Sequence, residues 1–217
     1  ELDSYIKGRT QEKRKEVPLI SVGDQNSISH NKGALAFFGL QDYIGEEKMN
    51  EALKAFHEKW TWKTLKPTSS SLIEEIKKVT PDSLSYLLSD LFQHITAFEN
   101  TASEAAYSVV AGDRYELTIN LSTEKLQVDA SGLEKPMPID DWIDVGVYTE
   151  DPNGAVRLSY LKKHKFTRKK TTLTISLREK PVKVGIDPLN KLIDHHANDN
   201  VIRVVDVVDL TNSPLGN

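Results

Sequence analysis

The residues that could do chemistry in this chain are first of all its six histidines, and their spacing decides which of them can. His57 and Glu58 begin like the zinc-binding pattern H-E-x-x-H, but Thr61 stands where the second histidine is needed. Two ligands on one helix face must be four residues apart, so no pair is formed here. We therefore predict that His57 and Glu58 are surface residues of a helix.

A second candidate metal site is the pair His195 and His196, which lies close to Asp194 and Asp199. Histidine and carboxylate side chains are common ligands of zinc. However, adjacent side chains point apart in a regular helix or strand, which argues against two converging ligands. The segment is more simply interpreted as a solvated loop.

Two further clusters of charge have simple structural explanations. The carboxylates of Asp140 and Asp141 could share acid-base work, but neighbours at the start of a strand face opposite sides of a sheet. The segment Lys162–Lys170, "KKHKFTRKK", could bind phosphate. Its position between two predicted strands and the acidic remainder of the chain favour a solvated hairpin tip instead.

Composition limits the classes of function. The chain has 217 residues, of which 38% are hydrophobic and 28% charged, as in soluble globular proteins, and two modest domains fit this length best. A net charge of -4 and a pI near 5.9 argue against a nucleic-acid partner. Without cysteine, disulfides, thiol catalysis and thiolate metal sites are excluded. Because it begins "ELDSYIKGRT", without an initiator methionine or a signal segment, we expect a piece of a longer protein.

Residues 1–95 have the apolar periodicity of helices. Asn31 to Ile44 is apolar almost all round, so we expect a helix that is buried on most sides and ended by Gly45. The next helix carries one apolar stripe, namely Met49, Ala52, Leu53, Phe56 and Trp60. Ser71 and Glu74 have the spacing of a capping box.

The last predicted helix begins at Thr80 and Pro81, a cap followed by proline in the first turn. Its apolar stripe is the clearest in the chain: Leu84, Leu87, Leu88, Leu91, Phe92 and Ile95.

After about Thr96 the apolar period changes from 3.6 to 2, which indicates half-buried strands. Alternation recurs in several short runs, as in Tyr115, Leu117, Ile119 and Leu121, and a final strand is expected over Val201–Val208. The sequence therefore predicts an α+β chain, with a helical domain over residues 1–95, a small antiparallel β-sandwich over 96–210 and a tail over 211–217.

The segment "SHNKGALAFFGLQDYIGEEKMNEALKAFHEKW", Ser29–Trp60, resembles a known enzyme family. It is similar to the stretch after the zinc site of gluzincin aminopeptidases of the aminopeptidase N type, where a Tyr-x-Lys-Gly step opens a buried helix. The resemblance is nearest to bacterial members fused to transporter-type membrane segments. It continues through "VTPDSLSYLLSDLF", "DDWIDVGVY", "YLKKHKF" and "VGIDPLNKLID" and so covers nearly the whole chain.

The resemblance implies that residues 1–95 are the helical end of a thermolysin-like catalytic domain, followed by the β-sandwich domain of the family. Aligned on Asn31, Lys32 and Gly33, the tyrosine position is occupied by His30, which departs from the family pattern. The family's tyrosine donates a hydrogen bond to the oxyanion of the tetrahedral intermediate, and an imidazole N–H can also donate. His30 is thus the candidate catalytic residue, in a helix start formed by Asn31, Lys32 and Gly33.

Two readings of function remain. In the first, the chain is a fragment of a zinc aminopeptidase that cleaves the N-terminal bond of a peptide substrate; it has no cofactor itself, because the zinc ligands lie upstream. In the second, the parent is a non-catalytic peptide-binding or scaffolding module of a transporter-associated membrane protein. Both place the parent in the bacterial cell envelope, beside upstream catalytic and membrane segments. Without those segments, the helix Asn31 to Ile44 is expected to expose an apolar face and to self-associate.

Overall fold

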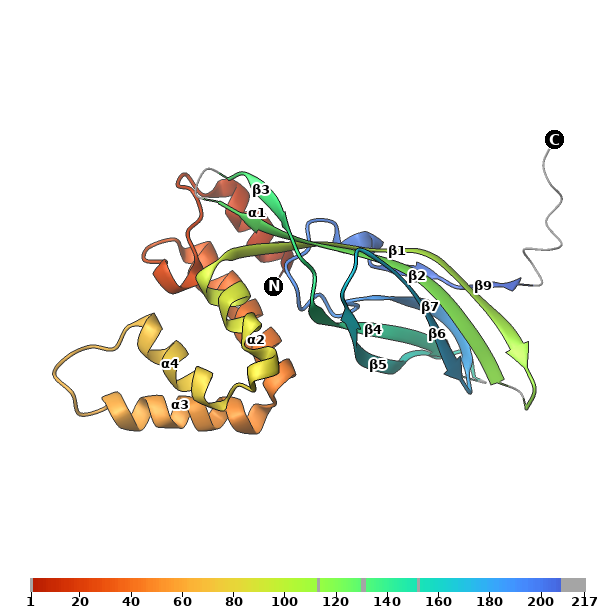
Figure 1. The fold of residues 1–217 in the computed structure, drawn as a ribbon, viewed down its shortest axis with the longest axis horizontal. Coiled ribbons are helices and arrows are strands. Elements are labelled where there is room, and N and C mark those ends of the chain that lie inside the picture. The colour runs from red at the N-terminus through yellow and green to blue at the C-terminus, as the bar shows by residue number, and fades with distance from the viewer. Residues whose placement is uncertain (1, 113, 130–131, 152, 208–217) are drawn as a thin grey trace. The chain divides into compact units, whose positions relative to one another are not determined.

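The computed structural model describes residues 2–112, 114–129, 132–151 and 153–207. It contains both helices and strands, which confirms an α+β chain, and the first strand begins at Ile95 (Figure 1). The chain forms two compact units. The first comprises Glu1–Thr96 with Gln127–Lys135 and Lys191–Ile193, and the second comprises Ala97–Leu126, Pro136–Asn190 and the chain from Asp194. The predicted tail, residues 211–217, lies outside the described residues.

Helices make up most of the first unit. They are α1 (Leu2–Gln11), the 3-10 helix η1 (Leu19–Ser21), the π-helix η2 (Ser27–Lys32), α2 (Gly33–Ile44), α3 (Glu46–Trp60) and α4 (Ser69–Val79). The predicted helix over Asn31–Ile44 was therefore wrong in its start, because a π-helical turn precedes the α-helix. Its predicted end at Gly45 is confirmed, where φ is +92°, a value that glycine adopts without strain. Within the described residues, no helix combines the length and apolar character needed to span a bilayer.

The apolar faces of α2 and α3 are narrower than their sequences suggest. On α2, Leu35 and Leu40 are buried, but Ala34 is exposed and Phe38 is 56% exposed. On α3, Leu53 is exposed even though its stripe neighbours Met49 and Ala52 are buried. Burial of α2 on most sides is thus confirmed, and the side with Ala34 and Phe38 is exposed.

The beginning of α4 differs from the capping box predicted from Ser71 and Glu74. Thr68 is the cap, and its side chain accepts a hydrogen bond from the backbone N–H of Ser71. The Ser71 hydroxyl in turn accepts from the Thr68 N–H, so a serine does the work that glutamate does in the usual box.

The last predicted helix is broken into short pieces instead of being one continuous helix. They are the 3-10 helix η3 (Asp82–Leu84), α5 (Tyr86–Leu88) and the π-helix η4 (Ser89–Gln93). Leu87, Leu88 and Phe92 are buried as the stripe predicts, but Ile95 already belongs to a strand. The stripe was therefore correct about burial and wrong about the regularity and length of the backbone.

The strands form two sheets. They are β1 (Ile95–Val110), β2 (Arg114–Val128), β3 (Glu134–Met137), β4 (Asp141–Glu150), β5 (Val156–Phe166), β6 (Lys170–Leu177), β7 (Lys180–Ile186), β8 (Val201–Arg203) and β9 (Val205–Asp206). One sheet has the order β3-β2-β1-β9, with β6 also paired to β2, and the other has the order β5-β4-β7-β8. Figure 1 shows them as two layers, with β1 and β2 in one and β4, β5 and β7 in the other.

Alternating burial follows the predicted period of two. Leu117 and Ile119 of β2 are fully buried, whereas Glu116 and Thr118 between them are exposed. The sheets are not wholly antiparallel as predicted, because β9 pairs with β1 in parallel, with Ala106 opposite Val205. The expected last strand is split at Val204, which places β8 in one sheet and β9 in the other.

Candidate functional site

His30 lies on the exposed side of the π-helix η2. Its Nδ1 is 3.0 Å from the carbonyl oxygen of Asn26 and 3.1 Å from Oγ of Ser29. A carbonyl only accepts, so this geometry assigns the proton of the neutral ring to Nδ1 and leaves Nε2 as an acceptor. Nε2 makes no hydrogen bond to any of the described residues. The ring can therefore donate from Nε2 only when it is an imidazolium.

Lys32, two residues further on, points the opposite way and is the centre of a buried cluster that the sequence did not reveal. Its side chain is 1% exposed, and its Nζ lies 2.7 Å from Oε1 of Glu16. Nε of Arg9 lies 3.0 Å from the other oxygen of Glu16, and the Tyr5 hydroxyl donates to both oxygens at 2.9 and 3.0 Å. We call Tyr5, Arg9, Glu16 and Lys32 the Glu16 cluster.

Burial and neighbouring charge both change the pKa values of the Glu16 cluster. Burial lowers the pKa of Lys32, and the carboxylate of Glu16 opposes that shift. Burial raises the pKa of Tyr5, and the negative charge of Glu16 raises it further, so the phenol stays protonated and donates. Ile28, one helical turn before Lys32, is fully buried as well. The cluster thus anchors the inner side of η2, while His30 is held on its outer side.

A pocket of about 200 Å³ lies beside the Glu16 cluster within the first unit. Its lining is mostly charged and includes Arg9, Glu12, Arg14 and Lys15 besides Glu16. His30 does not line this pocket. The structure therefore brings together Lys32 and residues of α1 and of the following segment, but it does not bring His30 into the same group.

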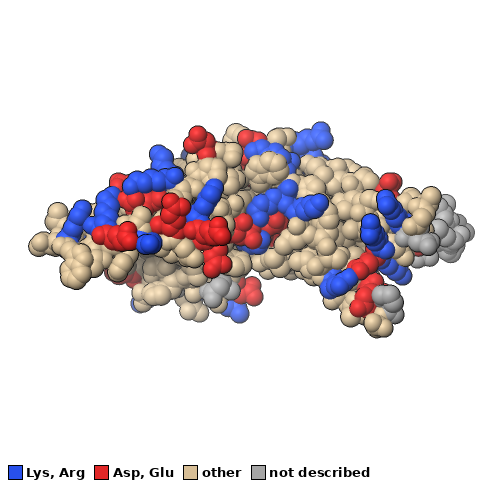
Figure 2. Space-filling model, turned by 90° about the horizontal axis from the view of Figure 1, so that it is seen from below, with Lys and Arg blue, Asp and Glu red and all other residues tan. Residues whose placement is uncertain are grey.

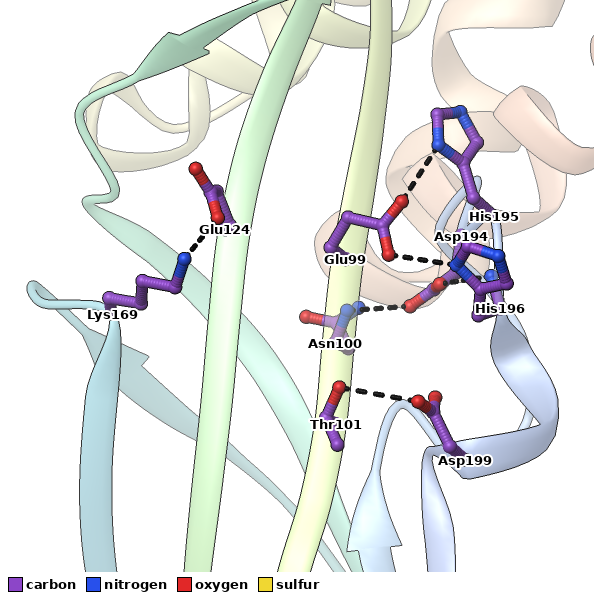
Figure 3. A network of polar contacts seen from close by, with 9 residues as sticks. All are labelled: Glu99, Asn100, Thr101, Glu124, Lys169, Asp194, His195, His196 and Asp199. Carbon is purple, nitrogen blue, oxygen red and sulfur yellow. Dashed lines mark hydrogen bonds and ion pairs between the residues drawn. The ribbon is translucent and has the colours of Figure 1, made fainter.

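Glu99 of β1 bridges both histidines of the His195–His196 pair (Figure 3). One carboxylate oxygen lies 2.9 Å from Nδ1 of His195 and the other 3.0 Å from Nδ1 of His196. The predicted loop is confirmed, and because the alternation of a helix or strand does not apply to an irregular loop, both rings can turn toward Glu99. We call Glu99, His195 and His196 the Glu99 triad.

The loop that carries the two histidines is fixed to β1 by its own acidic residues. Asp194 is fully buried and accepts hydrogen bonds from the backbone N–H groups of Asn100 at 3.0 Å and of His196 at 2.9 Å. Burial raises the pKa of Asp194, and these hydrogen bonds oppose the rise. Further along, the Thr101 hydroxyl donates to Asp199 at 3.4 Å. Backbone positioning is thus the evident role of these two aspartates.

The remaining charged candidates have structural roles. His57 and Glu58 are exposed on α3, as predicted. Asp140 pairs with Lys165, and Asp141 pairs with the buried Lys125, so the two carboxylates do not share a partner. The basic segment is not a hairpin tip as predicted, because it leads from β5 in one sheet to β6 in the other. Its lysines pair with nearby acids: Lys163 with Asp144, Lys165 with Asp140 and Lys169 with Glu124.

Within the part of the chain that the structure describes, no three His, Asp or Glu side chains are grouped so that they could hold a metal ion. The residues present therefore do not fit a zinc site of their own. Comparison with known proteins gives no match to a family model and none to a curated protein.

The Glu99 triad predicts a pH-dependent contact. The hydrogen bond to Glu99 raises the pKa of His196 above its usual 6.5, so its contribution is complete below that pH and is lost as pH rises through the raised pKa. For Glu99, burial raises the pKa, but the bonds to His196 and His195 outweigh burial and lower it below 4.5. The contribution of ionised Glu99 to the stability of the folded state is present above pH 4.5 and is lost on further acidification. The contact is therefore strongest between pH 4.5 and pH 6.5.

An NMR titration of the His196 ring checks this prediction. Wild type should titrate above pH 6.5, and Glu99→Gln should move the midpoint down. Asp199→Asn is the matched control and should move it less, because Asp199 acts on His196 only through its charge at a distance. An unchanged midpoint in Glu99→Gln would show that the carboxylate does not hold the ring in solution.

Proposed function

We propose that this chain is part of a zinc aminopeptidase-like protein of the bacterial cell envelope, in which a peptide substrate is cleaved at its N-terminus. The segment Ser29–Trp60 carries the resemblance to the family. The first unit would be the helical end of a thermolysin-like catalytic domain, and the second its β-sandwich domain. The resemblance places the zinc ligands upstream, because this sequence contains no H-E-x-x-H.

The single observation that carries the proposal is the π-helical turn Ser27–Lys32. Such turns are rare and are frequent at functional sites. It occurs in the segment that aligns with the catalytic helix start of the family, and it holds His30 outward and Lys32 inward. His30 would donate a hydrogen bond to the oxyanion of the tetrahedral intermediate. The exposed side of α2, with Ala34 and Phe38, is where we expect upstream helices to pack, or a second copy in their absence.

A second candidate function is favoured by the same histidine. Because Nδ1 of His30 donates to Asn26, the neutral ring has no proton on Nε2 for an oxyanion. The tyrosine of the family needs no such protonation. This favours a non-catalytic peptide-binding or scaffolding module of a transporter-associated protein.

Metal analysis and peptidase assays separate the two functions. For the 217-residue chain alone, we expect neither stoichiometric zinc after dialysis nor release of N-terminal amino acids from peptides. The full-length parent of an aminopeptidase should bind one zinc through an upstream H-E-x-x-H and a later glutamate, and should cleave peptides. A parent without that motif and without activity would leave the binding module as the function, and a tightly held zinc in the chain alone would refute the placement of the ligands upstream.

A further inference from the structure

The loop between α3 and α4 exposes large apolar side chains to a degree found nowhere else in the described residues. We call Lys59–Thr68, "KWTWKTLKPT", the Trp62 tip. Trp62 is 94% exposed and Leu65 78% exposed, whereas no other large apolar side chain among the described residues exceeds 62%. All residues from Thr61 to Ser70 are exposed. Exposed apolar groups of this size mark a surface that meets a partner.

The Trp62 tip is also basic. It contains Lys59, Lys63 and Lys66, and the first acidic residue after it is Glu74. Lys59 pairs with Glu75 at 2.6 Å, but the structure gives neither Lys63 nor Lys66 a carboxylate partner among the described residues. Figure 2 shows blue lysine atoms and tan atoms at this end of the helical unit, and red atoms further along the helices. Two apolar side chains thus stand among unneutralised positive charges.

The two helices hold the tip in place. α3 and α4 run side by side in opposite directions, and the tip joins them at one end (Figure 1). The Lys59–Glu75 pair ties the end of α3 to α4, and the carboxylate side chain of Glu75 is only 4% exposed. Thr68 caps α4 on the other side of the loop. The two ends of the segment that carries Trp62 and Leu65 are therefore fixed by the helical hairpin.

The chemistry of the tip fits an anionic bilayer surface. Tryptophan is enriched at membrane interfaces, where its ring lies among the headgroups and its N–H stays hydrated. Lysines beside it bind anionic headgroups, and each lysine raises the affinity for the bilayer about fivefold. A second copy is a poorer partner, because a symmetric contact would bring Lys63 and Lys66 against the same charges. We propose that the Trp62 tip inserts Trp62 and Leu65 into the interface of an anionic lipid bilayer, with Lys63 and Lys66 on its headgroups.

Sedimentation with lipid vesicles tests this. The 217-residue chain should bind phosphatidylcholine vesicles that contain about one phosphatidylglycerol in three, bind pure phosphatidylcholine far less, and be released by salt. Trp62→Ala with Leu65→Ala should lower the partition coefficient about 10- to 100-fold. Lys63→Ala with Lys66→Ala should lower it about 20-fold on the anionic vesicles only.

Matched controls keep the test specific. Trp142→Ala removes another exposed tryptophan, in β4, and Lys48→Ala with Lys77→Ala removes two exposed lysines from the other end of α3 and α4. Both should bind like wild type. In a variant with Trp60→Phe and Trp142→Phe, Trp62 is the sole tryptophan, and its emission should shift to the blue on anionic vesicles. The Trp60 Nε1 has no hydrogen bond in the structure, so phenylalanine loses none there.

Three outcomes would overturn the proposal. The first is wild type that does not bind anionic vesicles, and the second is tip variants that bind as well as the controls. The third is a change from dimer to monomer in the Trp62→Ala, Leu65→Ala variant without a change in vesicle binding, which would assign the tip to self-association.

Discussion

Replacing Glu16 with glutamine is expected to destabilise the helical unit by about 3–5 kcal/mol, as breaking a buried ion pair from one side does. Among the described residues, Glu16 is the only carboxylate bonded to Lys32, and the Lys32 side chain is 1% exposed. Without Glu16, the folded protein must either bury an unpaired ammonium or release its proton. Glutamine keeps the shape and an acceptor for Tyr5, so packing and that hydrogen bond change little. Chemical denaturation of the two proteins measures the difference.

The pH dependence distinguishes this cause from a general loss of packing. If the folded Glu16→Gln protein contains neutral Lys32, the cost is the proton that it gives up on folding. That cost shrinks as pH rises from about 7 toward the usual lysine pKa of about 10.4, so the variant should regain stability relative to wild type.

The double variant Glu16→Gln, Lys32→Met is the matched control. Methionine removes the buried charge and fills similar space, so the double variant should be more stable than Glu16→Gln alone. A loss below about 1 kcal/mol in Glu16→Gln would mean that Lys32 reaches water or another acceptor in solution.

The Glu16 cluster was beyond sequence reasoning for a physical reason. Glu16 follows "QEKRK", a run of charged residues that is typical of a solvated segment. Its burial arises from two non-local partners, Tyr5 and Lys32, which are 11 and 16 residues away. Hydrophobic periodicity indicates which residues share a face of one element, but it does not indicate which separate elements pack together. A lysine at the start of an apolar helix was the available signal, since a buried ammonium needs a counter-ion.

The local hydrophobic pattern predicted which residues are buried better than it predicted the backbone conformation. The stripe through Leu87, Leu88 and Phe92 is buried, yet the chain there is a 3-10, α and π sequence. The backbone shape was also missed at Ser27–Lys32, because an α-helix was expected from Asn31, whereas a π-helix comes first and the α-helix begins at Gly33. A π-turn satisfies nearly the same apolar spacing as an α-turn, so hydrophobic pattern alone does not separate them.

The Glu99 triad shows where a rule for regular structure does not predict side-chain direction. The rule that neighbouring side chains diverge is a property of regular helices and strands. His195 and His196 directly follow an isolated parallel bridge between Phe98 and Asp194 and are not part of a strand. The rule therefore does not apply to them. An acidic residue on each side of the pair, Asp194 and Asp199, was the only hint of a polar network, and the carboxylate that joins the rings is Glu99, on a distant strand.

In the full-length parent, His30→Ala is expected to lower kcat about 10²- to 10³-fold if His30 is the oxyanion donor, which is the usual effect of losing one such donor. Zinc content and folding should not change, because His30 is exposed and its hydrogen bonds are local ones to Ser29 and Asn26. KM should change little, since the interaction is made in the transition state.

Two further variants, His30→Tyr and Ser29→Ala, test the assigned role of the His30 ring. Because the proton of the neutral His30 ring lies on Nδ1, His30→Tyr should raise kcat, since its phenol supplies a donor at that position. Ser29→Ala is the control, because it removes the other contact of Nδ1 and leaves the bond to Asn26. If the parent is instead a binding module, wild type and His30→Ala are equally inert, and His30→Tyr restores cleavage only where the upstream zinc ligands are intact. An active parent that His30→Ala leaves unchanged would assign the oxyanion to another group, and the buried Lys32, held by Glu16, is too far inside the fold to take over without unfolding the turn.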